Sequence, residues 1–251
     1  MTAVPAGRIR IGCAGWTLPA DVQQRFPPGD SHLQRYAQVF SASEINSSFH
    51  RPHRPSTYER WASSVPADFA FSAKLPKAIT HAARLAEPEA ALDAFLAEVR
   101  GLGPSLQCLL VQLPPSLAFE LRVADAFAAA LSGRHAGPVA LEPRHASWFS
   151  PEVDRWLAHR RIARVLADPV RHDGGRTPGG WPGLVYLRLH GSPRVYYSSY
   201  DEAVLQALAS RLREAADRGA DVWCIFDNTA GQAAAGNALA LLRLLGQTKG
   251  G

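Results

Sequence analysis

The chain contains 251 residues, of which 47% are hydrophobic and 20% are charged. This mixture excludes disorder, collagen and coiled coil as descriptions of the whole chain. The formal net charge is +5, and because lysine occurs only at positions 74, 77 and 249, almost all of the positive charge is arginine. A mild basic excess of this kind is compatible with anionic ligands, nucleic acid included.

The cysteines and the hydropathy pattern indicate in which cellular compartment the protein resides. Cys13, Cys108 and Cys224 all lie inside apolar runs, and an odd number in such positions indicates reduced, buried thiols rather than a disulfide framework. No apolar run reaches the length of a membrane span, and the segment 1–10 lacks the apolar core of a signal peptide. We therefore expect a soluble, cytoplasmic protein that does not associate with a membrane.

Short strand-like runs recur along the whole chain. They are 8–13, 42–47, 69–74, 108–113, 139–144, 163–168, 184–190 and 222–227. Several are almost entirely apolar until a polar residue appears near the end. That pattern is typical of strands in a parallel sheet, which helices cover on the outside.

Helical spacing fills most of the intervals between these runs. Leu92, Phe95, Leu96 and Val99 form one apolar stripe, Val204, Leu205, Leu208 and Leu212 form another, and Leu121, Phe127 and Leu131 mark a third helix before Gly133. Asp201 and Ser150 precede two of the helices as expected N-caps, with Pro151 in the first turn after Ser150. The last helix is expected over about 232–245.

Eight strands, each followed by a crossover, predict an α/β fold, specifically a single (β/α)8 TIM-type barrel over residues 1–251 with its core at about 8–246. A doubly wound open sheet is the alternative, but the segment 12–16 after the first strand is not the G-x-G-x-x-G turn of that fold. The sixth crossover, 169–183, is too rich in glycine and proline for a helix. We expect an irregular loop there, either functional or a surface excursion.

Polar residues gather where the predicted strands end. These residues are Glu44, Asn46, Lys74, Gln112, Glu142, Arg144, Asp168, Arg188, His190, Asp227 and Asn228. In a parallel barrel these ends meet at one rim, where active sites are built. The alternative is a ring of salt bridges that satisfies itself, because buried charges need partners.

Anion binding suits these residues better than metal binding. Glu44, Glu142, Asp168, His190 and Asp227 are possible metal ligands, but three cations at the same rim would repel a divalent ion. Arg144 and Arg188 can each offer a planar fork to a phosphate or carboxylate, and Lys74 adds a point charge. Proton transfer would then fall to Glu44, Glu142 or His190. We expect no metal and no cofactor.

Aromatic side chains follow two of the strands. Tyr196 and Tyr197 come after the seventh strand, and Trp148 follows the fifth. They can form a stacking platform for a sugar or a base, or they can pack the loops onto the top of the barrel.

Seven segments in order carry a family resemblance. They are GCAGW (12–16), EINSSFH (44–50), FSAK (71–74), QLPP (112–115), EPRHASW (142–148), YLRLHG (186–191) and FDN (226–228). Together they resemble the YecE-like family, domain of unknown function seventy-two. The resemblance implies a TIM-type barrel and names no reaction. Cys13 and Asp227 depart from the threonine and asparagine often found there, which implies that neither is indispensable to a shared chemistry.

The leading functional hypothesis is an enzyme that acts by acid–base chemistry on a small anionic molecule, sugar-like or phosphorylated. Glu44 and Glu142 would transfer protons and His190 would assist. The substrate would contact Asn46, Lys74, Gln112, Arg144, Arg188, Trp148, Tyr196, Tyr197 and Asn228. A nucleic-acid binding or processing protein and a metal-dependent hydrolase are the alternatives.

Overall fold

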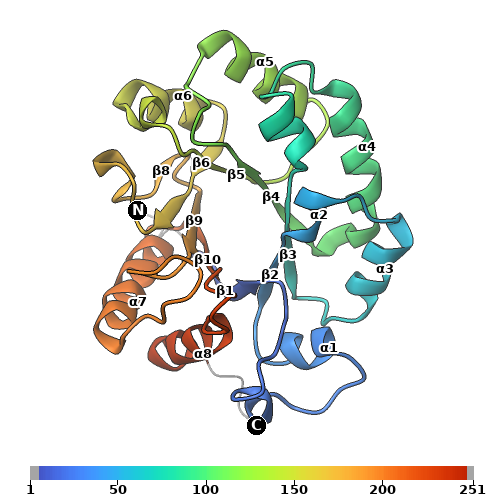
Figure 1. Cartoon of the computed structure of the whole chain (residues 1–251), viewed down its shortest axis with the longest axis vertical. Helices are drawn as coiled ribbons and strands as arrows, with labels where there is room; N and C mark the ends of the chain where they lie inside the picture. Colours follow the sequence, from blue (N-terminus) through green and yellow to red (C-terminus); the bar gives the residue numbers. More distant parts are fainter. Residues whose placement is uncertain (1–5, 248–251) are drawn as a thin grey trace.

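The strands of this chain form one sheet that curves into a ring (Figure 1). The computed structural model describes residues 6–247. In the order of the sheet the strands are β7 (Leu166–Asp168), β9 (Leu184–Leu189), β10 (Asp221–Phe226), β1 (Ile9–Ala14), β2 (Ala42–Ile45), β3 (Ala70–Lys74), β4 (Leu106–Gln112), β5 (Val139–Glu142), β6 (Ile162–Arg164) and β8 (Gly179–Gly180). All these neighbours pair in parallel except β6 and β8, which are antiparallel.

The segment 162–168, which contains β6 and β7, nearly closes the ring of strands. β6 pairs with β5 and β7 pairs with β9, while only Val165 separates β6 from β7. The predicted sixth strand, 163–168, is therefore split in two. Two residues of the predicted loop, Gly179 and Gly180, form the added strand β8, and the rest of 169–183 contains one 3-10 turn and no α-helix.

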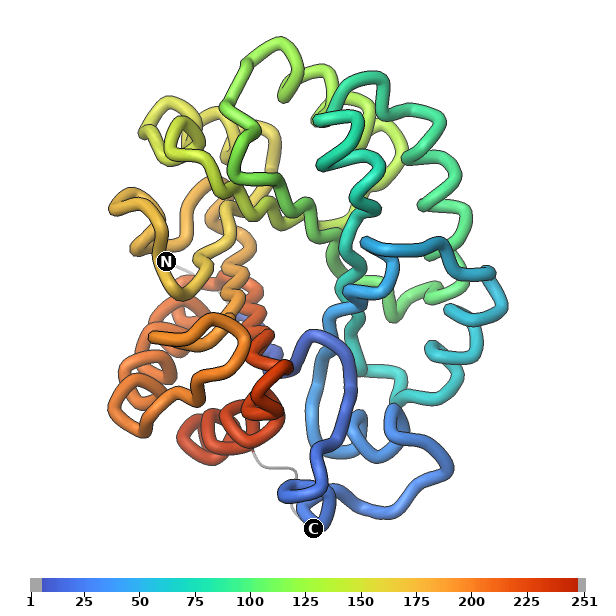
Figure 2. Tube along the Cα trace, in the orientation of Figure 1, coloured from blue at the N-terminus to red at the C-terminus, as the bar shows by residue number. Residues whose placement is uncertain are grey.

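Helices cover the outside of the ring (Figure 1). They are α1 (His32–Ala37), α2 (Ser47–His50), α3 (Pro55–Ser63), α4 (Glu89–Val99), α5 (Leu121–Ser132), α6 (Pro151–His159), α7 (Glu202–Asp217) and α8 (Ala234–Leu245), with a π-helical turn at Ala78–Ala82. Successive segments proceed around the ring in one direction (Figure 2). None of the helices within 6–247 has both the length and the apolar character needed to span a membrane.

The predicted helical stripes are mostly buried. All four apolar residues of the stripe in α4 are buried, and Ser150 and Asp201 cap α6 and α7 through their side chains. Leu121 and Val204 are exceptions, exposed at 57% and 46%. Both lie in the first turn of a helix, where the chain has only begun to approach the sheet.

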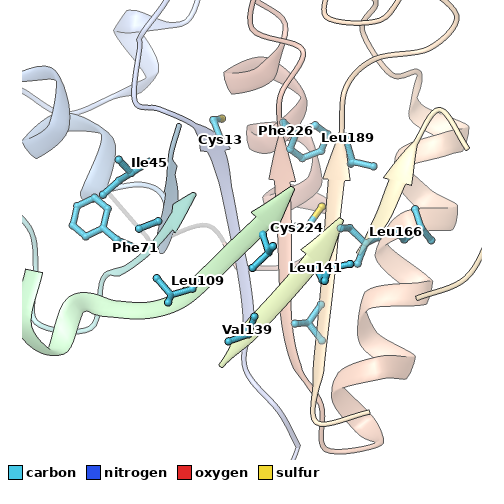
Figure 3. Packing of buried hydrophobic residues seen from close by; sticks show 14 of the residues in the cluster. Cys13, Ile45, Phe71, Leu109, Val139, Leu141, Leu166, Leu189, Cys224 and Phe226 are labelled. Atoms are coloured by element: carbon cyan, nitrogen blue, oxygen red, sulfur yellow. The ribbon is translucent and has the colours of Figure 1, made fainter. Parts of the chain in front are cut away.

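The main apolar core lies between the sheet and the helices. It joins strand residues such as Leu109 and Leu141 to helix residues such as Phe95 and Leu212, all buried. Figure 3 shows Leu109 and Leu141 on neighbouring strands of this cluster. Burial of these side chains stabilises the ring by roughly 1.5–3 kcal/mol for each large residue.

A second, smaller core fills the inside of the ring. Small inward side chains from several strands, such as Ala42, Ala70 and Ala140, leave room for two large rings. Tyr186 stacks on Trp223 there, with the centroids 5.7 Å apart and the planes 11° apart. Because side chains alternate along a strand, the residues two positions after this apolar layer point into the same space. They are the polar residues of the rim.

Candidate functional site at the carboxyl ends of the strands

A buried arginine connects three carboxylates across the ring. Arg188 on β9 donates from Nη2 to Glu44 Oε1 at 2.7 Å, from Nη1 to Glu142 Oε2 at 2.6 Å and from Nη2 to Asp227 Oδ2 at 2.7 Å. Glu44 lies on β2, Glu142 on β5 and Asp227 directly after β10, so the guanidinium spans the ring. Burial alone would lower the pKa of Arg188, but the three carboxylates raise it well above its usual value.

This arrangement changes the role expected for Arg188. Its side chain is 1% exposed, and each guanidinium nitrogen already donates to a carboxylate. No donor remains for a substrate anion, so the predicted direct contact does not fit the geometry. Arg188 is a positioning residue that holds the carboxyl ends of four strands together.

Glu44 is equally enclosed. Its Oε2 accepts from Arg188 Nε at 2.9 Å and from the Tyr186 hydroxyl at 2.8 Å, and Tyr186 in turn contacts Ser72 Oγ at 2.7 Å. Glu44 is 0% exposed. A carboxylate with both oxygens occupied and no solvent contact cannot exchange a proton with a substrate in this state, contrary to the expected proton transfer.

Glu142 is also fully engaged. Its Oε1 accepts from Gln112 Nε2 and from Arg144 Nε, both at 3.0 Å, while Oε2 accepts from Arg188. Burial would raise the pKa of Glu142, but Arg188 and the other neighbouring cations outweigh burial and lower it. Glu142 therefore stays ionised and anchors Gln112 and Arg144, an arrangement that does not favour the proton transfer expected of it.

His190 joins the same network in its neutral form. Its Nε2 lies 3.0 Å from Arg188 Nη1, which can only donate, and its Nδ1 lies 3.1 Å from the carbonyl oxygen of Asp168. The tautomer with the proton on Nδ1 satisfies both contacts. Burial lowers the pKa of His190, whereas burial raises that of the nearby Asp227.

A small pocket opens beside this network. Its wall contains Glu142, Arg144, Phe149, Val165, Arg171, His172, His190 and Tyr196 among other residues. The space open to the centre of a water molecule is about 40 Å³. That is room for a few water molecules or for one small anionic group.

The polar groups free to meet a ligand in this pocket are cationic or neutral. Arg144 uses Nε for Glu142, and its two terminal nitrogens donate to no group in residues 6–247. Arg171 is an exposed arginine of the loop 169–183. His172, from the same loop, contacts the Arg144 carbonyl oxygen through Nε2 at 3.2 Å. The carboxylate in the wall, Glu142, has no oxygen left for a ligand.

Lys74 lies at the same rim, at the end of β3. Its Nζ is 4.1 Å from the centroid of the Phe49 ring, a cation–π contact. Burial, followed by the charge of Arg188, lowers the pKa of Lys74 to about 8. Burial, Lys74 and Arg144 also lower the pKa of His81, which places these three side chains in one electrostatic neighbourhood.

The remaining predicted residues lie apart from the pocket. Trp148 is 1% exposed, and its indole N–H donates to the Leu117 carbonyl oxygen, so it packs the fold. Asn228 donates to the Ser198 carbonyl oxygen and to Asn237, and thereby holds the loop after β9. Asn46 begins α2, and its Oδ1 is buried without a partner among the described residues.

The two rim tyrosines differ. Tyr196 lines the pocket and meets the His190 ring edge-on, with the centroids 5.7 Å apart. Its φ of 69° is unusual for a residue other than glycine, and such strain is common near functional sites. Tyr197 is 49% exposed and stacks under the guanidinium of Arg194.

Sequence reasoning missed Tyr186, His172 and His81. Tyr186 precedes Arg188 and His190 at intervals of two, so the alternation of β9 could have placed all three on the inner face. His172 lies in a loop that showed only its glycine and proline content. The position of His81 depends on the π-helical turn after β3, and no periodic pattern of residues predicts that turn.

The metal-site hypothesis found no geometric support in the described residues. Within 6–247, no three His, Cys, Asp or Glu side chains are arranged to hold an ion. Glu44, Glu142 and Asp227 do converge, but around the guanidinium of Arg188.

Comparisons with known proteins place the chain in a family. UPF0759 protein YunF of Bacillus subtilis is 26% identical to this chain, and the match covers 94% of each protein. UPF0759 protein YecE of Escherichia coli K12 is 28% identical, and that match covers 64% of this chain and 59% of YecE. The crystal structure of a DUF72 family protein from Enterococcus faecalis superimposes with a TM-score of 0.79 at 20% identity, covering 97% of both chains. The model of the family described as "Protein of unknown function DUF72" matches residues 10–251, and the chain belongs to that family.

Proposed function

We propose that this protein is an enzyme that binds a small anionic molecule, sugar-like or phosphorylated, in the pocket beside Arg144. The observation that carries the proposal is the guanidinium of Arg144. Its Nε is fixed by Glu142, its two terminal nitrogens donate to no group in residues 6–247, and Arg144 lines a pocket whose carboxylate is already saturated. A planar fork held in this way suits a phosphate or a carboxylate.

The pocket also supplies a group for proton transfer. With Nε2 of His172 donating to the Arg144 carbonyl oxygen, Nδ1 keeps a lone pair that can accept a proton from a bound substrate. His190 assists as a neutral wall residue, locked by Arg188 and by the Asp168 carbonyl oxygen. Glu44 and Glu142 act indirectly, because they fix the cations.

Titration of inorganic phosphate by calorimetry tests the binding step. Arg144→Met should weaken binding about tenfold or more, the equivalent of about 1.4 kcal/mol or more. Arg155→Met is the matched control, since Arg155 is 76% exposed and pairs only with the exposed Glu152. Equal affinities in the wild type and Arg144→Met would contradict the proposal.

Proton exchange tests the chemical step. A panel of phosphorylated sugars in D2O, followed by NMR, should show deuterium entering at a carbon next to a carbonyl, and His172→Ala should abolish this exchange. His159→Ala, in the last turn of α6, serves as the control. If none of these sugars exchanges a proton for deuterium or is converted in any other way, the acid–base part of the proposal is contradicted.

Nucleic-acid binding remains a second candidate because of the loop after β9. Tyr196 and Tyr197 are 40% and 49% exposed, and Arg194 lies over the Tyr197 ring. Exposed aromatic rings beside arginine are typical of single-strand binding. Retention on DNA or RNA that weakens as salt rises would support this candidate, and lack of retention at low salt would eliminate it.

We also infer that the ring is a (β/α)8 TIM-type barrel forming a single domain. In this interpretation β6 and β7 are one sixth strand interrupted at Val165, and β8 is an addition from the irregular sixth crossover. An experimental structure with continuous pairing along 162–168 would support the interpretation.

We propose a cytoplasmic location because the cysteine thiols are free. Cys13, Cys108 and Cys224 are free and buried, and burial raises the pKa of the Cys13 thiol to about 12, which makes it a poor nucleophile. Reduced thiols are typical of a reducing compartment. Cell fractionation would test this location.

A further inference from the structure

Lys74 differs from an ordinary salt-bridging lysine. Its side chain points into the ring from the end of β3 and is 7% exposed. Among the described residues no carboxylate lies within salt-bridge distance of Nζ, because Arg188 takes Glu44, Glu142 and Asp227. The amine instead lies over the face of the Phe49 ring, 4.1 Å from its centroid.

Charged groups surround this amine from several elements. Those that act on it are Arg188 of β9, Glu44 of β2, Glu142 of β5 and Asp227, which follows β10, and it acts in turn on His81 of the π-helical turn. The guanidinium of Arg188 already neutralises much of the carboxylate charge, so the amine gains little from being protonated. Burial lowers its pKa to about 8, so about a tenth of the amine is unprotonated at pH 7 and about half at pH 8, far more than for a lysine with its ordinary pKa.

We propose that Lys74 is a nucleophile that forms a Schiff base with a carbonyl substrate carrying an anionic group. The Nζ lone pair attacks the carbonyl carbon, the C=O π pair moves to oxygen, and a proton passes from nitrogen to that oxygen to give a carbinolamine. The carbinolamine hydroxyl then takes up a proton from solvent and leaves as water, while the nitrogen lone pair forms the C=N bond of a cationic, protonated Schiff base. Formation of the Schiff base requires no further oxidant, reductant or cofactor.

The inference rests on the proposed function for substrate choice, since Arg144 and the pocket would hold the anionic group. It adds a covalent step and narrows the substrate to an aldehyde or ketone. His172 would then remove a proton from the carbon next to the C=N bond, where the cationic imine draws electrons.

Reductive trapping in the wild-type protein tests the inference directly, because the chain has only three lysines. The protein is incubated with glyoxylate and sodium cyanoborohydride at a pH near 8, the value to which burial lowers the pKa of Lys74. Peptide mass spectrometry then compares Lys74 with Lys77, an exposed lysine three residues away. Lys74 should be alkylated faster, by about tenfold or more. Equal or slower modification of Lys74 would overturn the inference.

A neutral aldehyde separates this inference from the proposed anion pocket. With glycolaldehyde, Lys74 should still react faster than Lys77, and in Arg144→Met the preference for glyoxylate over glycolaldehyde should disappear. If Lys74 reacts selectively but never prefers glyoxylate, the lysine inference stands and the anion pocket fails. If phosphate binding depends on Arg144 while Lys74 stays unmodified by both aldehydes, the pocket stands and the lysine inference fails.

Discussion

Arg188 shows why the site is built from buried charges. One guanidinium balances Glu44, Glu142 and Asp227 across the ring, and Gln112, Tyr186 and Arg144 complete the hydrogen bonds. Burial of such a network costs desolvation free energy. The network holds its side chains in one arrangement only when every member has its hydrogen-bond partners. The saturated carboxylates thereby leave Arg144 and Lys74 as the groups available to a ligand.

Removal of the Arg188 guanidinium should therefore strongly lower the free energy of unfolding. Arg188→Met removes the cation that three buried carboxylates share and leaves Arg144 beside Glu142 alone, and we expect a loss of about 3–5 kcal/mol in the free energy of unfolding. Arg155→Met should cost less than about 1 kcal/mol, because its ion pair with Glu152 is exposed. Denaturant unfolding measures both. Similar midpoints for the two variants would contradict the role given to Arg188.

Lys74 should reduce stability in a pH-dependent way. Its pKa falls from 10.5 to about 8 on folding, so the unfolded chain binds more protons between these values and wild-type stability rises with pH there. Lys74→Met should be more stable than the wild type below pH 8, on the order of 3 kcal/mol at about 1.4 kcal/mol per pKa unit. The difference should vanish towards pH 10.5.

Lys77→Met is the control for this measurement, since Lys77 is exposed on the turn after β3. Its stability difference from the wild type should stay flat over the same pH range. A flat difference for Lys74→Met as well would contradict the burial of the Lys74 amine.

At the scale of elements, local patterns predicted most strands and helices. The apolar stripe of α4 and the caps Ser150 and Asp201 needed only spacing and residue type. The break at Val165 was not predictable, because the predicted strand 163–168 contains no glycine or proline to interrupt it. Tertiary pairing produces the break, with β6 bonded to β5 and β7 to β9.

The strand β8 gives the loop 169–183 its anchor. Gly180 has a φ of +68°, and a Cβ there would lie 2.4 Å from the Ile162 carbonyl oxygen, whereas Gly246, with a φ of +69°, has open space. Both alanine variants bear the left-handed penalty of roughly 1–2 kcal/mol, and Gly180→Ala adds the clash. We expect Gly180→Ala to melt lower than Gly246→Ala and to bind phosphate more weakly, because His172 loses its position. Equal melting temperatures would contradict the anchoring role of β8.

At the scale of the whole molecule, the sequence predicted which polar side chains meet at one rim but not how they pair. The polar ends of eight predicted runs indicated one rim, and Glu44, Glu142, Arg188, His190 and Asp227 do meet there. Which carboxylate pairs with which cation depends on contacts across the ring, between residues 144 positions apart in the case of Glu44 and Arg188. No local pattern encodes such a pairing.

Under the proposed function, the closed arrangement would let a rim of mixed charge select anions. The carboxylates pair with Arg188, whereas Arg144 and Arg171 line the pocket and the Lys74 amine lies over the Phe49 ring. An anion would therefore meet donors without meeting a free carboxylate.

A crystal structure of the protein grown with selenate tests this most directly, because selenium gives an anomalous signal at the site of the bound anion. We expect a peak in the pocket within hydrogen-bond distance of the terminal nitrogens of Arg144, and its loss in Arg144→Met. Selenate peaks at surface arginines alone, with the Arg144 pocket empty, would contradict anion binding at the rim.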